Sequence, residues 1–412
     1  MLFDSNDRQT LRELARQVAD IADHPEMRRR ESAWTEHNSL RSKRPLMLVF
    51  PEGSWGEILP DSVLKCRAAD ARGIEWQLKV RIHIFEHFQD DNVIGKDWLI
   101  GKQIHHSSWG LEPRRIASPT ARGAWHFDPV IKEPADLKKL TFPEARYDEA
   151  STTQDLTGMQ ELFGDILNVK LVGMKSISYH LMSQYTALRG LEEVMVDMIA
   201  EPQMLHDAMA FLTEGHKRLL KQYTEMNMLA FNNDATYHSS GGNGFTDELP
   251  KPDANPDHAR PCDMWSSAES QELAQVSPEH HAEFALKYEK QLLEPFGLNG
   301  YGCCEDLTLK LDDVLTIPQI RRISCSPWAN VEACARRLKG DYIFSWKPHP
   351  AHLVGDFNTG AIRKYLRDAL AITKANGCVF EMVLKDTHTC DNHPERFDEW
   401  TRIAREEIQA AT

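Results

Sequence analysis

Short apolar runs alternate with longer segments of helical periodicity along most of the chain. From Pro45 onward the hydrophobic residues form brief runs, and between these runs they recur every three or four positions. This alternation predicts parallel β-strands joined by helical crossovers. Seven strands are expected, and they lie at Leu46–Phe50, Ile166–Val172, Met228–Phe231, Gly297–Gly300, Ile320–Cys325, Tyr342–Trp346 and Cys378–Leu384.

The number of predicted strands favours one α/β fold over its main competitor. Seven strands at this spacing, with one more that the pattern does not reveal, favour a (β/α)8 TIM barrel over an open doubly wound sheet. Ahead of them, Leu11, Leu14 and Val18 recur at helical spacing among charged residues. We therefore expect an N-terminal helical extension at residues 1–44, acting as a cap or as a homodimer contact, and a barrel domain at residues 45–412.

Composition and charge exclude several classes of protein. The 412 residues carry a formal net charge of -14, which repels a phosphate backbone, so nucleic acid is not an expected partner. No apolar run approaches the roughly 20 residues that a membrane helix needs, and the charged N-terminal segment lacks the apolar core of a signal peptide. We therefore expect a cytoplasmic protein whose 8 cysteines are thiols.

Strand alternation places ionisable residues on the inner face of two predicted strands. In Tyr342–Lys347 the aromatic residues share one face, so Lys347 falls on the other. In Cys378–Lys385 the same alternation puts Glu381 and Lys385 opposite the apolar face. Barrel enzymes hold their active sites at the C-terminal strand ends, which makes these three residues candidates for catalysis. Lys347 binds a substrate carboxylate, forms an imine with the substrate, or forms a structural ion pair with Glu381, and anion binding is the preferred interpretation.

The segment Tyr301–Asp306 has the highest local density of potentially reactive side chains, because two adjacent thiols are followed directly by a carboxylate. If the segment is extended, Cys303 and Glu305 lie on one face and Cys304 on the other. Thiolate and carboxylate groups bind zinc, so these three residues are candidate metal ligands. The alternative is that both cysteines are buried small residues beside a helix N-terminus.

A second cluster follows the last predicted strand. Asp386 and His388 are two residues apart, as are His388 and Cys390, and this spacing lets two ligands of an extended segment meet one ion. His388 and Cys390 are therefore further candidate zinc ligands. The alternative is a polar loop that caps the helix beginning near Pro394.

A polar loop at residues 231–242 follows the predicted strand Met228–Phe231. Asp234 and His238 are candidate catalytic groups that orient a substrate, and Tyr237 is a candidate substrate contact. An ordinary surface loop is the alternative. The other ring-bearing residues expected to contact the substrate are Trp265, Tyr301, Trp328 and His349.

Several segments resemble the uroporphyrinogen decarboxylase superfamily, and more closely its methyltransferase-like branch. This resemblance implies a (β/α)8 barrel, and it extends from about residue 45 to 410. Within the branch, the chain resembles a subgroup whose reaction is unassigned. The segments that carry the resemblance are Asp128–Leu140, Leu188–Pro202, Tyr237–Pro250, Tyr301–Glu305, Lys347-Pro348 and Pro394–Phe397.

The resemblance also implies methyl transfer between a methylated substrate, a corrinoid carrier protein and a thiol, with zinc held by a His-x-Cys pair and a later cysteine. Here the pair falls at Tyr301-Gly302-Cys303, so tyrosine replaces the histidine. Uroporphyrinogen decarboxylases carry an Arg-rich segment after the first strand, and Phe50–Glu57 lacks it, which argues against a tetrapyrrole substrate. The residues expected to rebuild the zinc site are Cys303, Cys304, Glu305, His388 and Cys390.

Three functions remain open from the sequence. The first is a zinc-dependent methyltransferase, or demethylase, that moves a methyl group between a small methylated substrate and a corrinoid or thiol acceptor. The second is a decarboxylase or lyase in the same barrel, in which Lys347 or Lys385 holds a substrate carboxylate. Asp234 or Glu381 then supplies the proton. The third is a non-enzymatic subunit that binds a ligand or a corrinoid protein at the barrel mouth.

Overall fold

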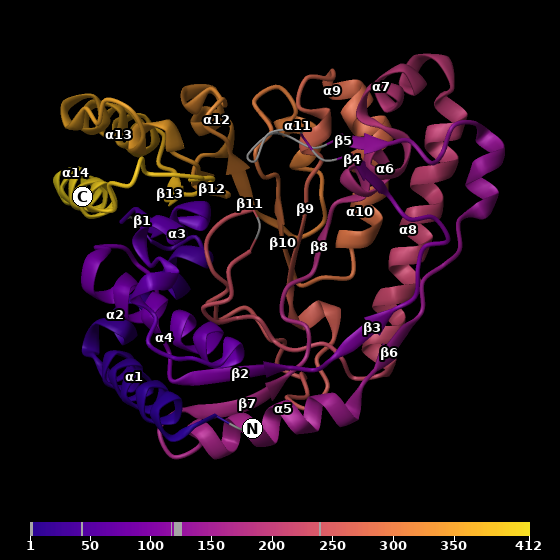
Figure 1. The fold of residues 1–412 in the computed structure, drawn as a ribbon. Helices are drawn as coiled ribbons and strands as arrows, with labels where there is room; N and C mark the ends of the chain where they lie inside the picture. Colours follow the sequence, from indigo (N-terminus) through magenta and orange to yellow (C-terminus); the bar gives the residue numbers. More distant parts are fainter. Residues whose placement is uncertain (1–2, 43, 117, 119–125, 239) are drawn as a thin grey trace.

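The centre of the fold is a sheet of seven parallel strands (Figure 1). The computed structural model describes residues 3–412 apart from 43, 117, 119–125 and 239. The strands lie in the order β1-β13-β12-β11-β10-β9-β8, which confirms the predicted α/β class. Their bounds are β1 (Leu46–Val49), β8 (Ser178–Tyr179), β9 (Trp265–Ala268), β10 (Leu298–Tyr301), β11 (Ile320–Cys325), β12 (Ile343–Trp346) and β13 (Val379–Leu384).

Helices pack on the outer face of the sheet, because parallel strands need crossovers that carry an apolar face back to it. The aromatic side of β12 shows this packing, since the ring of Trp346 lies 4.9 Å from Tyr365 and 5.9 Å from Phe380. The helices are α3 (Trp55–Ile58), α5 (Glu149–Phe163), α6 (Leu181–Arg189), α7 (Leu191–Ala200), α8 (Pro202–Glu225), α9 (Pro278–His281), α10 (Lys287–Leu293), α11 (Leu311–Val314), α12 (Val331–Leu338), α13 (Thr359–Ala375) and α14 (Glu395–Ala411).

Side chains from strands that are not neighbours meet on the inner face of the sheet. Arg322 of β11 and Glu381 of β13 are separated by β12, and yet Nε of the arginine lies 3.1 Å from Oε1 of the glutamate. Two strands in these positions are about 10 Å apart in a flat sheet. The inner face is therefore concave, and the charged residues predicted to point inward do so.

The described residues do not show a closed barrel, because β1 and β8 are the two edges of the sheet. Other segments lie along these edges. The backbone N–H of Asp91 donates to the carbonyl of Met47 in β1, and Met174, just before β8, forms a parallel bridge with Leu229. The structure confirms a parallel, inwardly curved sheet, which is the coarser part of the prediction.

Two predicted strands take other places, and two strands of the main sheet were not predicted. Ile166–Val172 forms β7 (Asn168–Val172), which pairs with β2 (Asp97–Gly101) outside the main sheet. Met228–Phe231 contributes only the bridge at Leu229 among the described pairings. The unpredicted strands β8 and β9 are short and rich in serine, so they lack the apolar run that reveals a strand. Two further pairs are β3 (Ile104–His106) with β6 (Ala145–Tyr147) and β4 (Arg114–Ile116) with β5 (His126–Asp128).

The N-terminal extension is helical, as predicted, but it also reaches the core. Helix α1 (Ser5–Asp23) and helix α2 (Pro25–Asn38) meet at His24, and the apolar face of α1 packs on α4 (Ala69–His87). At the end of α2, Nε2 of His37 lies 3.0 Å from Oε2 of Glu381 on the inner face of the sheet. The extension is therefore part of the barrel-like core as well as a cover for one side.

No helix within the described residues combines the length and the apolar character that crossing a membrane requires.

Candidate active site at the strand ends

Ionisable side chains gather where the parallel strands end. Because the C-terminal ends of parallel strands share one edge of a sheet, residues that directly follow different strands meet there. Several of the residues at this edge were predicted, and three others, Glu52, His180 and Glu269, were not. The set is Glu52 after β1, His180 after β8, Glu269 after β9, Cys303 to Glu305 after β10, Lys347 after β12, and Lys385 with Asp386 after β13.

Cys303 is the most strongly activated group in this set. Its Sγ lies 3.5 Å from Sγ of Cys304 and 3.6 Å from Nζ of Lys385. A hydrogen bond from Cys304, together with the positive charges of Lys385 and Lys347, lowers the pKa of Cys303 to about 6. Both thiols are partly exposed. The lowered pKa favours the thiolate form of Cys303, and neither cysteine is fully buried, which makes the pair a candidate reactive or metal-binding site.

A glycine turn and a buried carboxylate fix this cysteine in place. Gly302 has a φ of +90°, a backbone conformation that other residues rarely adopt, and it turns the chain sharply at the end of β10. Oε2 of Glu305 then accepts the N–H of Cys303 at 2.8 Å, while Oε1 faces the N–H of Ser270 at 3.3 Å. Burial and the charge of Glu269 raise the pKa of Glu305 to about 7. Glu305 thus supports the turn from within, and its oxygens point away from the thiols.

His180 and Glu269 form a charged pair at the same edge, next to Cys303. The Nδ1 atom of His180 is hydrogen-bonded to Oε1 of Glu269, and this bond raises the pKa of the histidine. The side chain of His180 is 44% exposed, whereas that of Glu269 is 1% exposed. The imidazole can therefore exchange a proton with a bound substrate. Sequence reasoning missed the pair because it follows β8 and β9, the two strands whose patterns carry no signal.

The described residues at the end of the loop at residues 231–242 pack on the concave face, whereas Asp234 and Ala235 near its start reach the surface. A Cβ atom on Gly241 would lie 1.8 Å from Oγ of Ser345, so the backbone itself touches β12. His238 is buried against Trp265, and burial lowers its pKa to about 3, which keeps the imidazole neutral. Tyr237 is partly buried, with its ring centroid 4.5 Å from that of Phe50. These side chains form the floor beneath the strand-end groups.

Lys347 and Glu381 point inward as predicted, but they lie under this loop. Nζ of Lys347 donates to the carbonyl of Ser240 and to Oγ of Ser345, each at 2.8 Å, and burial lowers its pKa to about 8. Burial alone would raise the pKa of Glu381, but the charge of Arg322 and a hydrogen bond with His37 lower it to about 2. Their side chains are at most 1% exposed. Both residues therefore hold the loop and the core together, and the direct Lys347–Glu381 ion pair is not formed.

The remaining predicted contacts are scattered. Asp234 pairs with Lys175 and lines a separate pocket of about 540 Å³ against α4 and β2. Tyr301 is buried and donates its hydroxyl proton to Glu289 at 2.6 Å. Trp265 lies under the guanidinium of Arg322, 5.0 Å from its ring. Trp328 is 67% exposed and packs on His349 with ring centroids 4.9 Å apart, so these two remain available to a substrate.

The structure brings together two of the five predicted zinc ligands. A tetrahedral zinc ion with Zn–S distances of about 2.3 Å separates two sulfur ligands by roughly 3.8 Å, which the 3.5 Å between Cys303 and Cys304 approaches. Asp386 is the nearest carboxylate, with Oδ2 3.6 Å from Sγ of Cys304. The cysteine pair therefore fits two corners of a zinc site, with Asp386 beside it as a third donor.

The other three predicted ligands lie elsewhere. Glu305 is engaged by backbone N–H groups, as described above. Cys390 is buried and donates its thiol proton to Oε2 of Glu57 at 3.1 Å, and Thr389 donates to the same carboxylate. His388 is exposed to solvent. The polar segment after β13 is tied to Glu52 and Glu57 after β1, and within this fully described segment no side chain caps the helix at Pro394, which was the alternative given for it.

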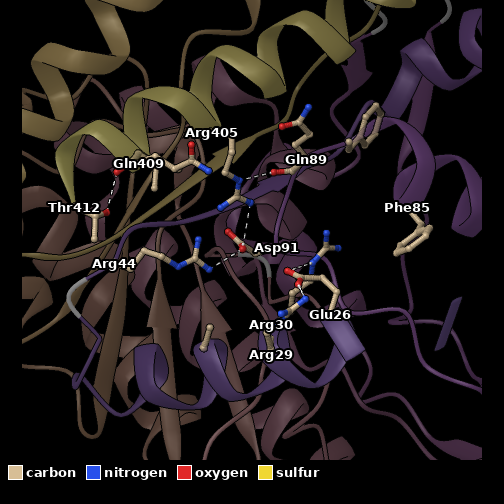
Figure 2. Close-up of a pocket in the computed structure, with 13 residues that line it drawn as sticks. Glu26, Arg29, Arg30, Arg44, Phe85, Gln89, Asp91, Arg405, Gln409 and Thr412 are labelled. Carbon is tan, nitrogen blue, oxygen red and sulfur yellow. Dashed lines mark hydrogen bonds and ion pairs between the residues drawn. The ribbon is translucent and has the colours of Figure 1, made fainter. Parts of the chain in front are cut away.

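A larger pocket of about 720 Å³ lies between α2, α4 and α14, away from the strand ends (Figure 2). Its four arginines, Arg29, Arg30, Arg44 and Arg405, share two carboxylates, those of Glu26 and Asp91. Arg44 and Arg405 both face Oδ1 of Asp91, at 2.8 and 3.2 Å, and Arg29 lies 2.7 Å from Glu26. Figure 2 shows these groups pointing toward one another across the pocket. The ion pairs around the pocket connect the surrounding segments, and none of the strand-end residues lines it.

In comparisons with known proteins, neither a family model nor a curated protein sequence matches this chain.

Proposed function

We propose that the protein is a methyltransferase whose reacting centre is the Cys303–Cys304 pair at the C-terminal edge of the sheet. The observation that supports this function best is the accessible thiolate of Cys303, with Nζ of Lys385 at 3.6 Å. The resemblance of the sequence segments to the methyltransferase-like branch of the uroporphyrinogen decarboxylase superfamily supports the same reaction class. The donor and acceptor in the proposal are a small methylated molecule and a corrinoid protein or a thiol.

The proposal also includes a complete (β/α)8 barrel. Its remaining wall would be formed by the segments that lie along the two sheet edges, around Asp91 and around Leu229. A barrel of this kind would enclose the loop at residues 231–242 as its filled interior and leave the strand-end residues at its mouth. A corrinoid domain would then dock over the mouth.

In this proposal, different residues of the chain bind the metal, favour the thiolate and transfer the proton. Cys303 and Cys304, with Asp386 nearby, would hold zinc, which supplies Lewis acidity to a bound thiol or to a heteroatom that carries the methyl group. Metal binding requires deprotonated thiols, and Lys385 favours the thiolate of Cys303. The bond to Glu269 raises the pKa of His180 and so favours its protonated form, which would deliver a proton to the leaving heteroatom.

The test combines metal content with turnover. We expect protein purified under reducing conditions to lose about one zinc ion per chain in the variant Cys303→Ser/Cys304→Ser. The matched control is Cys262→Ser/Cys378→Ser, which changes two partly buried cysteines elsewhere and should leave the zinc content unchanged. Methylcobalamin and a small thiol then serve as the methyl donor and acceptor. Equal zinc content in the two variants, with no methyl transfer by the wild-type protein, would contradict the proposal.

A decarboxylase or lyase is a second candidate, because Lys385 is a cation at the open edge of the sheet. Its side chain is 12% exposed, and the surrounding groups keep it charged. Lys347 cannot take this role while it is enclosed by Ser240 and Ser345. In this case a Lys385→Ala variant loses binding of a small carboxylate substrate and the cysteine variants retain it, which is the reverse of the result expected for methyl transfer.

A further inference from the structure

Two histidines and an aspartate meet between helices that are far apart in the sequence. His83 and His87 lie four residues apart in the last turns of α4, so they share one face of that helix. Asp398 lies in the first turn of α14. One ligand atom from each of the three side chains falls within 4.8 Å of the other two. Among the described residues, this is the group of three His, Cys, Asp or Glu side chains that comes together in this way.

Aromatic packing holds the cluster in place. The rings of His83 and His87 are stacked with centroids 4.1 Å apart. On its other sides His83 meets the edges of Trp55 and Phe88, at 5.6 and 5.3 Å. Phe88 in turn packs on Phe397, the neighbour of Asp398, at 5.9 Å. The two helices are therefore fixed relative to each other where the three polar groups converge.

The cluster has the composition and the access of a metal site. Nδ1 of His87 lies 3.2 Å from Oδ2 of Asp398, and these side chains are 44% and 43% exposed. An ion held by two imidazoles and one carboxylate keeps a position open for water, and solvent reaches this face. Imidazole nitrogen with carboxylate oxygen suits Zn²⁺, Co²⁺ or Ni²⁺ better than Ca²⁺ or Mg²⁺.

We propose that His83, His87 and Asp398 bind a divalent ion of the zinc, cobalt or nickel class, which clamps α4 to α14. This site has no residue in common with the cysteine pair, and it does not depend on the proposed methyl transfer. It is a structural site that joins α4 to the last helix of the chain, α14. A chain that carries both sites would release only part of its zinc when Cys303 and Cys304 are replaced.

The experiment uses the full chain with Cys303→Ser/Cys304→Ser, so that the thiols contribute nothing. Binding of Zn²⁺ is measured by calorimetric titration, and binding of Co²⁺ by its visible absorption. We expect binding of about one ion, weakened at least about tenfold by His83→Ala, by His87→Ala or by Asp398→Asn. The control, His258→Ala/His393→Ala, removes two histidines elsewhere and should bind as before. The Co²⁺ spectrum should show nitrogen and oxygen ligands without the thiolate charge-transfer band.

Thermal unfolding provides an independent readout. A ligand that binds only the folded chain raises the Tm by mass action, so Zn²⁺ should raise the Tm of the background protein and leave that of His83→Ala/His87→Ala unchanged. Circular dichroism checks that each variant is folded. Unchanged Zn²⁺ affinity in a folded His83→Ala/His87→Ala variant would overturn the proposal, and the pair of His87 with Asp398 would then be a simple interhelical contact. Neither result bears on the cysteine site.

Discussion

Nζ of Lys385 lies 3.6 Å from Sγ of Cys303, although their strands, β13 and β10, are separated in the sheet by β12 and β11. The curvature of the sheet produces this pair, because it brings the C-terminal ends of non-adjacent strands close together. Because only 12% of the side chain of Lys385 is exposed, water screens its charge less than that of a surface lysine.

Replacing Lys385 by methionine should make Cys303 less acidic. The positive charge favours the thiolate, so its loss raises the pKa of Cys303 from about 6 by about one unit. The measurement is the rate of iodoacetamide alkylation against pH in metal-free protein, followed at the Cys303 peptide by mass spectrometry. The midpoint of the profile should move to higher pH. The control Lys364→Met removes an exposed lysine on α13 and should leave the midpoint in place; a shared midpoint in all three proteins would contradict the assignment.

The hydrogen bond that Cys304 donates should help to lower the pKa of Cys303. In Cys304→Ala the thiolate loses the donor of Cys304 and keeps only Nζ of Lys385, so the pKa of Cys303 should rise by about one unit. Cys304→Ser keeps a donor of similar reach, so its alkylation profile should stay close to that of the wild type. Rescue by serine separates hydrogen bonding from a general change in packing, and an equal shift in both variants would refute the role given to the proton.

The buried pair of Glu381 and Arg322 should be essential to the fold. Glu381→Gln keeps the volume of the side chain but leaves the guanidinium of Arg322 without its counter-charge, which costs about 3–5 kcal/mol of the free energy of unfolding. Denaturant titration measures the loss. As a control, Asp247→Asn removes one partner of the exposed pair with Arg41 and should change stability little.

The Glu381–Arg322 pair should also make the free energy of unfolding depend on pH in the acid range. The pKa of Glu381 in the folded chain is lowered to about 2 from an ordinary value of 4.5. A lowered carboxylate pKa stabilises the fold above the unfolded value and loses this contribution as pH falls through the folded one. The free energy of unfolding should therefore decrease from about pH 5 toward pH 2, and this part of the decrease should be absent in Glu381→Gln. Parallel curves for the two proteins would contradict the prediction.

Strand periodicity predicted which residues face inward but not what occupies the space they face. The alternation in β12 and β13 correctly directed Lys347 and Glu381 to the inner face. Their roles differ from the prediction because the loop at residues 231–242, with Gly241 against Ser345, covers them, and no local pattern reveals a contact between segments more than 100 residues apart. His180 was missed for a related reason, since its two-residue strand depends on pairing with β9 and has no apolar signature of its own.

The glycine at position 241 gives the most direct test of the filled interior. Its φ is +133°, and an added Cβ would lie 1.8 Å from Oγ of Ser345 and 2.8 Å from Oε1 of Glu381. Gly241→Ala should therefore displace the loop from β12 and β13 and lower the free energy of unfolding by more than backbone strain alone, which is of order 1–3 kcal/mol. The control is Gly377→Ala, where φ is also positive, at +68°, and no atom lies within 4 Å of the new Cβ. Because both variants carry a backbone penalty and only one carries a clash, their difference in denaturant titration measures the contact. The displaced loop should also carry Ser240 away from Lys347 and so alter the alkylation profile of Cys303, which a surface loop would not do.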